Sequence, residues 1–188
     1  MLYQITSLLL EVAAGLIAGM CLLRWYMQYQ RIPMSARSGN PVGSFIFALT
    51  DWLVLPLRKV VPAVGRWDLA SLVAAFLLEL VRFLLLWAVS GFIGGPLAIG
   101  IYALFALVCL CLHGLSGMVI VYALLSWMQN QSAASDLLER LVTPMLTPIR
   151  RVLPLVAGVD LAPLALLVIM QILGIVVGTV QAAVLVAT

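Results

Sequence analysis

The sequence predicts an all-α membrane protein in which four transmembrane helices form two tandem helix–loop–helix repeats. Of the 188 residues, 65% are hydrophobic and only 9% are charged, whereas about a quarter of the residues of a soluble domain carry a charge. The chain also contains four apolar stretches, each longer than the roughly 20 residues that a helix needs to cross the hydrocarbon core of a bilayer. They lie at 2–23, 69–94, 97–126 and 161–187.

A repeated block of residues indicates an internal duplication. The segment PLRKVVPAVGRWDLA at 56–70 aligns without a gap with PIRRVLPLVAGVDLA at 148–162, at an offset of 92 residues. Each copy runs directly into an apolar stretch, so a loop and the span behind it recur as a unit. We therefore expect a first repeat at 1–95 and a second at 96–188, related by a pseudo-twofold axis along the membrane normal.

Residues at and between the ends of the spans predict how the spans are connected. The first stretch is expected to remain as a span rather than to be cleaved as a leader, because no basic residue precedes it and Glu11 interrupts it. Gly94, Gly95 and Pro96 break the chain between the second and third spans. Because this connection is short, the two spans are expected to form an antiparallel hairpin.

The distribution of basic residues predicts the orientation in the membrane. Of ten lysines and arginines, only Arg82 lies outside the two long connections between spans. Basic residues concentrate in cytoplasmic loops, so both long connections are expected in the cytoplasm and both termini on the opposite side. The net charge of +3 then belongs to the flanks of the spans, and no nucleic-acid binding is expected.

Each long connection contains a candidate interfacial helix. Asn40 and Pro41 predict a helix start, with Asn40 as the N-cap, and the helix of about 14 residues is expected to end before Pro56. In the second connection, Ser135 is the expected cap of a helix that ends before Pro148. Both helices are apolar over most of their surface, which is typical of helices in the membrane interface. The basic segments LRKVV and IRRVL that follow are expected to form a further interfacial turn.

The chain resembles the YggT family, also called YlmG, which has relatives in chloroplasts. The resemblance is carried by the doubled block, by LLRW at 22–25 with LLSW at 124–127, and by the Asn40–Pro41 pair. It implies an integral protein of the bacterial inner membrane. The roles attributed to members are osmotic-stress tolerance linked to cation uptake, cell division or nucleoid distribution, and cofactor assembly on a plastid cytochrome complex. The resemblance implies no chemical activity for particular residues.

Two aspartates precede the second span of each repeat, and two roles are open for them. Asp68 and Asp160 can cap the following helix by accepting backbone N–H bonds. Alternatively, they can form ion pairs with Arg58 and Arg150, which lie ten residues earlier in each copy. Both roles are compatible, because a carboxylate has several acceptor sites.

Four basic residues occupy matching positions in the doubled block, and they also have two interpretations. They can contact lipid headgroups and set the orientation of the chain, or they can form a docking surface for a partner protein. The residues are Arg58, Lys59, Arg150 and Arg151.

Polar residues also occur at mid-depth inside the spans. Glu79 and Arg82 lie three residues apart on one face of the second span, and we expect Arg82 to be neutralised by Glu79 and Glu11. In the second repeat, His113 aligns with Glu11, and Gln171 aligns with Glu79. These groups can act as polar contacts between helices or as a proton or cation relay.

The sequence favours a protein that binds over one that catalyses. Cys109, Cys111 and His113 do not share one helical face, and an odd number of cysteines in apolar stretches argues against a disulfide framework. We expect no cofactor and no metal. The leading hypothesis is a non-enzymatic inner-membrane protein that binds lipids and other membrane proteins, or a second copy of itself. The alternative is a small oligomeric cation channel or transporter component.

Overall fold

The computed structural model describes residues 2–34, 40, 42–61, 67–89, 96–127, 132–153 and 160–187. Within these residues every regular element is an α-helix, which confirms the predicted fold class. The helices are α1 (Leu2–Tyr29), α2 (Gly43–Arg58), α3 (Leu69–Val89), α4 (Pro96–Trp127), α5 (Ala133–Val152) and α6 (Ala162–Ala187). Four of them, α1, α3, α4 and α6, are long and apolar enough to cross a membrane. Gly94 and Gly95, where we expect the hairpin turn, lie outside the described residues.

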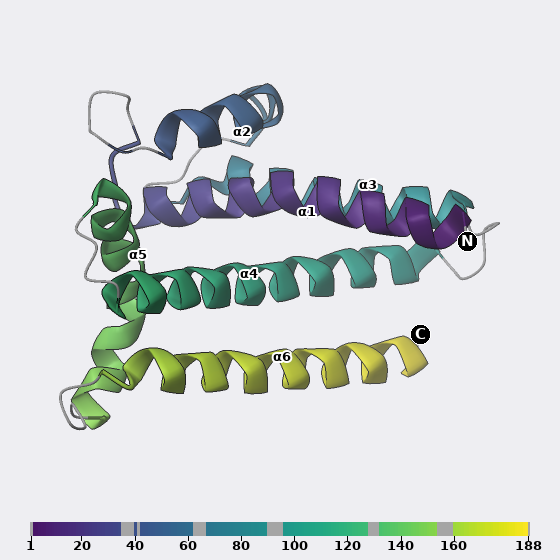
Figure 1. Cartoon of the computed structure of the whole chain (residues 1–188). Helices are drawn as coiled ribbons and strands as arrows, with labels where there is room; N and C mark the ends of the chain where they lie inside the picture. Colours follow the sequence, from purple (N-terminus) through teal and green to yellow (C-terminus); the bar gives the residue numbers. More distant parts are fainter. Residues whose placement is uncertain are drawn as a thin grey trace.

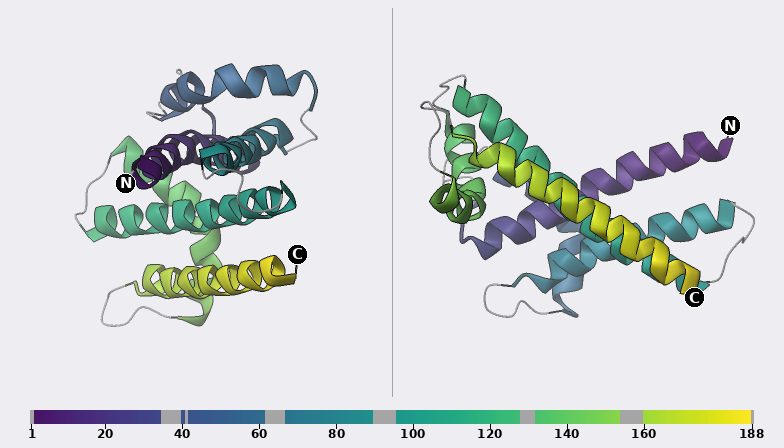
Figure 2. Two further views of the ribbon diagram at one scale, coloured as in Figure 1. Left: turned by 90° about the vertical axis from the view of Figure 1, so that its right-hand side faces the viewer. Right: turned by 90° about the horizontal axis from the view of Figure 1, so that it is seen from below.

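The long helices form two pairs, one from each repeat. Figure 1 shows α1 and α3 side by side, with α4 packed against them and α6 packed against α4. In Figure 2 the pair of α4 and α6 crosses the pair of α1 and α3 obliquely. α1 begins and α6 ends at one end of the bundle, whereas α5 crosses the other end and α2 lies against the side of α1 and α3 toward that end. The two long connections therefore share one end, as the sequence predicts. That this end faces the cytoplasm stays a prediction.

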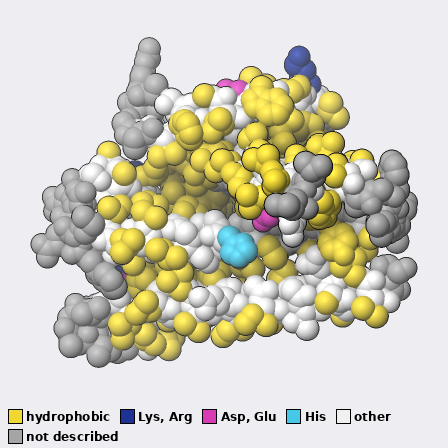
Figure 3. Space-filling view, turned by 45° about the vertical axis from the view of Figure 1, so that its right-hand side comes forward, with side chains coloured by type: hydrophobic (Ala, Val, Ile, Leu, Met, Phe, Trp, Pro, Cys, Tyr) yellow, Lys and Arg dark blue, Asp and Glu magenta, His cyan; other side chains and the backbone are white. Residues whose placement is uncertain are grey.

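The outer surface of the bundle is apolar. Only 11% to 22% of the most apolar window of each span is buried. Side chains such as Leu8 on α1 and Ile175 on α6 are more than half exposed, and Figure 3 shows hydrophobic groups spread over one face of the molecule. A monomeric soluble protein rarely exposes so large an apolar surface. The apolar outer surface of the bundle therefore suits contact with lipid.

Three clusters of buried side chains hold the helices together. The first joins α1, α2 and α3 around Val54 and reaches α4 at Leu107, and the second joins α4, α5 and α6 around Leu146. Val54 and Leu146 are fully buried and occupy the same position of the two repeats. The third cluster also joins the repeats, because Met27 and Ile46 of the first pack with Leu141 of the second.

The predicted bounds of the two interfacial helices are wrong at both ends. The N-cap of α2 is Val42 rather than Asn40, and the N-cap of α5 is Ser132, which forms a capping box with Ser135. At their other ends, α2 continues through Pro56 to Arg58 and α5 continues through Pro144 and Pro148 to Val152. In the first repeat only Leu57 and Arg58 of the basic segment are helical and the chain turns after them, as predicted, whereas in the second repeat the helix covers all of the segment but Leu153.

Both corrections have local physical reasons. The Asn40 side chain accepts a hydrogen bond from the Val42 N–H at 3.0 Å and donates to the Pro33 carbonyl at 3.1 Å, so it shapes the turn before the helix. A proline inside a helix removes one hydrogen bond and crowds the preceding turn. Pro56 and Pro148 lie on exposed helix surfaces, where the backbone has room to bend around the ring.

Candidate functional site

The doubled block forms one ion pair in each repeat. Arg58 Nη2 lies 2.6 Å from Asp68 Oδ2, and Arg150 Nη2 lies 2.6 Å from Asp160 Oδ2. In both repeats the arginine is near the end of the interfacial helix and the aspartate just precedes the next span. The pair therefore fixes the interfacial helix against the span that follows it, which is the ion-pair role that the sequence left open.

In the first repeat the carboxylate is buried. Asp68 is 1% exposed, and its Oδ2 accepts hydrogen bonds from Arg58 and from the Ser71 hydroxyl, each at 2.6 Å. Its Oδ1 has no hydrogen-bond partner among the described residues, so the carboxylate does not accept backbone N–H bonds of α3. Asp68 stands at the start of α3, where its backbone carbonyl accepts the Ser71 N–H at 3.1 Å, but its side chain bonds to Arg58 and to the Ser71 hydroxyl instead of to a backbone N–H.

The surroundings of Asp68 favour its charged form. Burial raises the pKa of this carboxyl, but the hydrogen bonds from Arg58 and Ser71, with the charges of Arg58 and Arg24, outweigh burial. The net result is a pKa below the ordinary value for an aspartate. Asp68 is thus an anion held between two arginines.

Arg24 is the central residue that the sequence did not single out. Its side chain is 2% exposed, and Nη1 donates to Thr50 Oγ1 at 2.7 Å and to Asp51 Oδ1 at 2.6 Å. Its Nε lies 3.9 Å from Asp68 Oδ2. Arg24 therefore connects α1 to α2 and to the start of α3. The available signal was the LLRW motif, where LLSW of the second repeat has Ser126.

In the second repeat the equivalent cluster is open. The side chains of Arg150 and Asp160 are 36% and 29% exposed. Asp160 Oδ1 accepts the Ala162 N–H at 3.0 Å, so here the carboxylate both caps α6 and pairs with the arginine. Arg150 also donates to the Tyr122 hydroxyl at 3.0 Å. Burial lowers the pKa of Arg150, but its hydrogen bonds with Tyr122 and Asp160 outweigh burial and raise it.

The second basic residue of each block has a different environment from the first. Lys59 and Arg151 are exposed and have no ion-pair partner among the residues that the structure describes. The valines that follow them, Val60 and Val152, are 79% and 80% exposed. Each block therefore has one arginine engaged in the fold and displays one basic residue beside an exposed valine.

The mid-membrane residues form two separate groups. Arg82 Nη1 lies 2.9 Å from Glu79 Oε2, and Glu79 is 1% exposed. Glu11 is exposed on α1, and no ion pair joins it to Arg82 within the described part of the chain. The expected three-membered cluster is therefore a pair. His113 and Gln171 are both exposed and line a groove of about 430 Å³ between α4 and α6. Figure 3 shows the histidine on the surface of the molecule.

Comparison with known proteins places this arrangement in a family. The family model described as CCB3/YggT matches residues 1–89 and 101–181, one segment in each repeat. The chain belongs to the CCB3/YggT family. The uncharacterized protein YggT of Escherichia coli K12 is 30% identical over 168 residues, which cover 89% of this chain and 86% of that protein.

Two further relatives extend the comparison. An uncharacterized protein of Vibrio alginolyticus is 30% identical over 177 residues, covering 92% of each chain. An uncharacterized protein of Pseudomonas aeruginosa is 31% identical over 160 residues, covering 83% of this chain and 79% of its own length. No solved structure matches this chain. The comparisons support the two-repeat form of the family. The names of the relatives assign no activity.

Proposed function

We propose that this chain is a non-enzymatic interaction or assembly factor of the bacterial inner membrane. It binds other membrane proteins through the shared end of its two repeats, which faces the cytoplasm. The observation that carries the proposal is the duplicated surface of Lys59 with Val60 and Arg151 with Val152. We define these four residues as the paired basic–valine surface.

The paired basic–valine surface suits binding because its charges are not used by the fold. Arg58 and Arg150 are neutralised by aspartates, whereas Lys59 and Arg151 remain available to an outside group. An exposed valine beside each charge adds apolar area to the contact. A partner with two acidic, partly apolar segments at the membrane surface fits this pattern, because complementary charges favour encounter and specificity.

The ion pairs behind this surface support a binding role rather than bond-making chemistry. Asp68 and Asp160 are each engaged by an arginine, and Asp68 is buried. Such groups fix helix positions and present the neighbouring basic residues at defined places. By resemblance to the family, the proposed role lies in osmotic-stress tolerance, cell division or envelope homeostasis.

The test is partner recovery from native membranes. A photo-crosslinking residue at Val60 or Val152 is expected to capture the same partner, because the two positions are equivalent in the repeats. The double variant Lys59→Glu/Arg151→Glu is expected to reduce that recovery at least about tenfold. Lys59→Arg/Arg151→Lys is the matched control, since it keeps both charges and should retain recovery. Arg58 and Arg150 are unsuitable for charge reversal because it would break the ion pairs of the fold.

Two results would contradict this proposal. One is undiminished partner capture by the charge-reversed protein. The other is capture of unrelated neighbours at positions 60 and 152, with no protein common to both.

An oligomeric cation channel is the second candidate, supported by the groove that contains His113 and Gln171. Both side chains lie on the outer face of α4 and α6, where a second copy can close the groove into a path. If this candidate is right, vesicles that contain the purified protein take up cations, and Gln171→Leu reduces that cation flux. Flux that persists after Glu79→Gln, His113→Leu and Gln171→Leu are combined would exclude a relay through these groups.

A further inference from the structure

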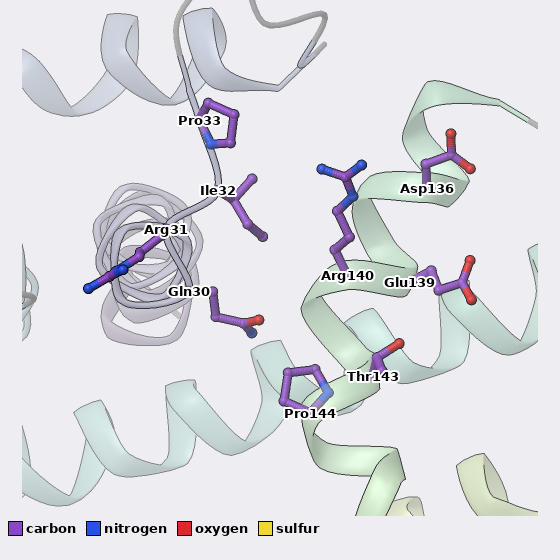
Figure 4. Close-up of a pocket in the computed structure, with 9 residues that line it drawn as sticks. All are labelled: Gln30, Arg31, Ile32, Pro33, Asp136, Glu139, Arg140, Thr143 and Pro144. Carbon is purple, nitrogen blue, oxygen red and sulfur yellow. The ribbon is translucent and has the colours of Figure 1, made fainter.

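A second surface lies between the two repeats, apart from the paired basic–valine surface. The end of α1 and the residues after it face α5 across a cleft of about 650 Å³, shown in Figure 4. A smaller cleft of about 200 Å³ adjoins it and shares four lining residues with it, namely Ile32, Pro33, Asp136 and Arg140. Because the walls come from different repeats, neither repeat forms this cleft alone.

A Schellman motif at the end of α1 shapes the first wall. The Ile32 N–H donates to the Met27 carbonyl at 2.9 Å and the Arg31 N–H donates to the Gln28 carbonyl at 3.0 Å. Arg31 has φ 57°, a left-handed conformation that glycine usually supplies at this position. For a residue with a side chain this conformation costs about 1–2 kcal/mol. The turn directs Ile32 and Pro33 toward α5.

Two hydrogen bonds across the repeats fix the floor of the cleft. The Tyr26 hydroxyl and the Gln30 amide both donate to the Leu141 carbonyl of α5, at 2.7 and 3.0 Å. Pro144 follows three residues later and has no N–H, so the carbonyl of Arg140 lacks its usual helical donor. Side chains at the end of α1 therefore bond to a backbone carbonyl of α5 in the turn that precedes this proline.

Arg140 lines the cleft and, among the described residues, lacks the ion pair that its position on the helix would favour. It lies four residues after Asp136 on α5, a spacing at which an acid and a base commonly pair. No ion pair joins them, and Arg140 has no acidic partner in the described ranges. Figure 4 shows its guanidinium directed toward Ile32 and Pro33, whereas the carboxylates of Asp136 and Glu139 are directed away from it. The cleft therefore displays positive and negative groups on separate sides.

We propose that this cleft binds the headgroup of phosphatidylethanolamine, with the phosphate on Arg140 and the ammonium on Asp136 and Glu139. An arginine binds a phosphate through several charge-assisted hydrogen bonds. The two carboxylates disfavour a headgroup with further negative charge and accept hydrogen bonds from a primary ammonium, which a choline cannot donate. The proposal does not rest on the proposed partner binding, because it uses different residues.

The position of the cleft in the fold matches headgroup depth. Trp25, Tyr29 and Trp67 lie near the same end of α1, with ring centroids 5.2 to 6.1 Å apart. Tryptophan and tyrosine concentrate where the hydrocarbon core meets the headgroups. α5 crosses the ends of α4 and α6 at this level, as Figure 1 shows. The cleft therefore lies at the depth expected for phospholipid headgroups.

The experiment is a lipid competition on the full-length protein. Native mass spectrometry measures which lipid the protein retains from micelles containing equal amounts of phosphatidylethanolamine, phosphatidylglycerol and phosphatidylcholine. The wild type is expected to retain phosphatidylethanolamine preferentially. Arg140→Gln is expected to lower that retention about tenfold, because the charged partner of the phosphate is lost. Arg140→Lys should restore part of it.

Further variants separate the parts of the proposal. Asp136→Asn/Glu139→Gln is expected to retain lipid but to lose the preference for ethanolamine over choline and glycerol. Ser44→Ala, which changes an exposed residue of α2 outside the cleft, is the control and should behave as the wild type. Unchanged lipid retention by Arg140→Gln, or a wild-type preference for phosphatidylglycerol, would overturn the proposal.

A final arm distinguishes lipid from free anions. Soluble glycerophosphoethanolamine and inorganic phosphate are added to the delipidated protein, and binding is followed by the thermal unfolding midpoint. The proposal expects neither to match the stabilisation that phosphatidylethanolamine gives at equal concentration. Equal stabilisation by inorganic phosphate would show a general anion site and overturn the lipid assignment.

Discussion

The two repeats use the same block of residues, but the first buries its ion cluster and the second leaves it near the surface. Asp68 is 1% exposed, whereas Asp160 is 29% exposed. The difference arises outside the block. Arg24 in the first repeat corresponds to Ser126 in the second, and Asp51 on α2 corresponds to Thr143 on α5. The block therefore supplies an ion pair in each repeat, and the preceding span and interfacial helix decide whether that pair is buried.

This difference predicts unequal energetic roles for the two clusters. Breaking a buried ion pair by removing one partner is strongly destabilising, because the remaining charge stays desolvated. An exposed pair contributes about 0–1 kcal/mol, since water screens both charges. We therefore expect the first repeat to be the rigid part of the interfacial end and the second to tolerate substitution.

The largest expected effect comes from removing the residue that distinguishes the repeats. Arg24→Met deletes the buried guanidinium that bonds to Thr50 and Asp51 and lies close to Asp68. We expect a loss of about 3–5 kcal/mol in the free energy of unfolding, measured by steric trapping in bicelles. Ser126→Ala, at the equivalent position of the second repeat, is the control and should leave it unchanged. A similar loss for both variants would remove the distinction between the repeats.

A matched pair of substitutions at the aspartates tests the same comparison directly. Asp68→Asn leaves Arg58 and Arg24 without a shared anion and is expected to cost about 2–3 kcal/mol. Asp160→Asn affects a partly exposed pair and is expected to cost about 0–1 kcal/mol. Thermal unfolding in one detergent compares the two variants. If Asp160→Asn proves the more damaging, exposure does not decide the energetics of these pairs.

The sequence predicts the common framework of the repeats better than their differences. The spans, the duplication and the two arginine–aspartate pairs follow from hydropathy, alignment and spacing along the chain. The sequence places Arg24 only among the basic residues of the first long connection, because its partners Thr50 and Asp51 lie on another helix and are brought near only by packing. Local patterns do not contain that information.

The exact ends of the interfacial helices and the cleft do not follow from the sequence, for related reasons. By local rules Pro56 and Pro148 should end their helices. α2 and α5 nevertheless continue beyond these prolines, because buried residues such as Val54 and Leu146 hold the helices against the bundle. The cleft needs α5 to lie against the end of α1, which no spacing within either segment specifies.

Gly43 offers a third contrast, between the starts of the two interfacial helices. A Cβ on Gly43 would overlap the backbone carbonyl of Met34, whereas Ser135 occupies the equivalent position of α5. Gly43→Ala therefore has to displace the chain before α2, and we expect a loss of about 1–3 kcal/mol in stability. Ser135→Ala removes the side-chain part of the capping box with Ser132 and should cost about 1 kcal/mol. Chemical denaturation in mixed micelles measures the stability of both variants. If Gly43→Ala leaves the stability unchanged, the backbone of Met34 does not lie close to Gly43 in solution.

The pH dependence of stability is a smaller effect that again separates the repeats. The pKa of Asp68 is held below its ordinary value of 3.8, so its anion stabilises the fold fully above that value. This contribution is expected to decline as pH falls below about 4 and through the lower folded-state pKa. Melting temperatures between pH 3 and 6 should fall toward acid in the wild type and less steeply in Asp68→Asn. Parallel curves for the two proteins would rule out Asp68 as the titrating group.

The smallest expected effect concerns the basic residues that the fold does not use. Lys59→Gln and Arg151→Gln change exposed side chains without described ion-pair partners, so neither should shift the unfolding midpoint measurably. Arg58→Gln, one residue away, should lower it, because that variant leaves Asp68 with one arginine fewer. The comparison is made by thermal unfolding of the three purified variants under one condition. A shift for Lys59→Gln as large as that for Arg58→Gln would mean that Lys59 also supports the fold, and the surface assigned to partner binding would then be structural.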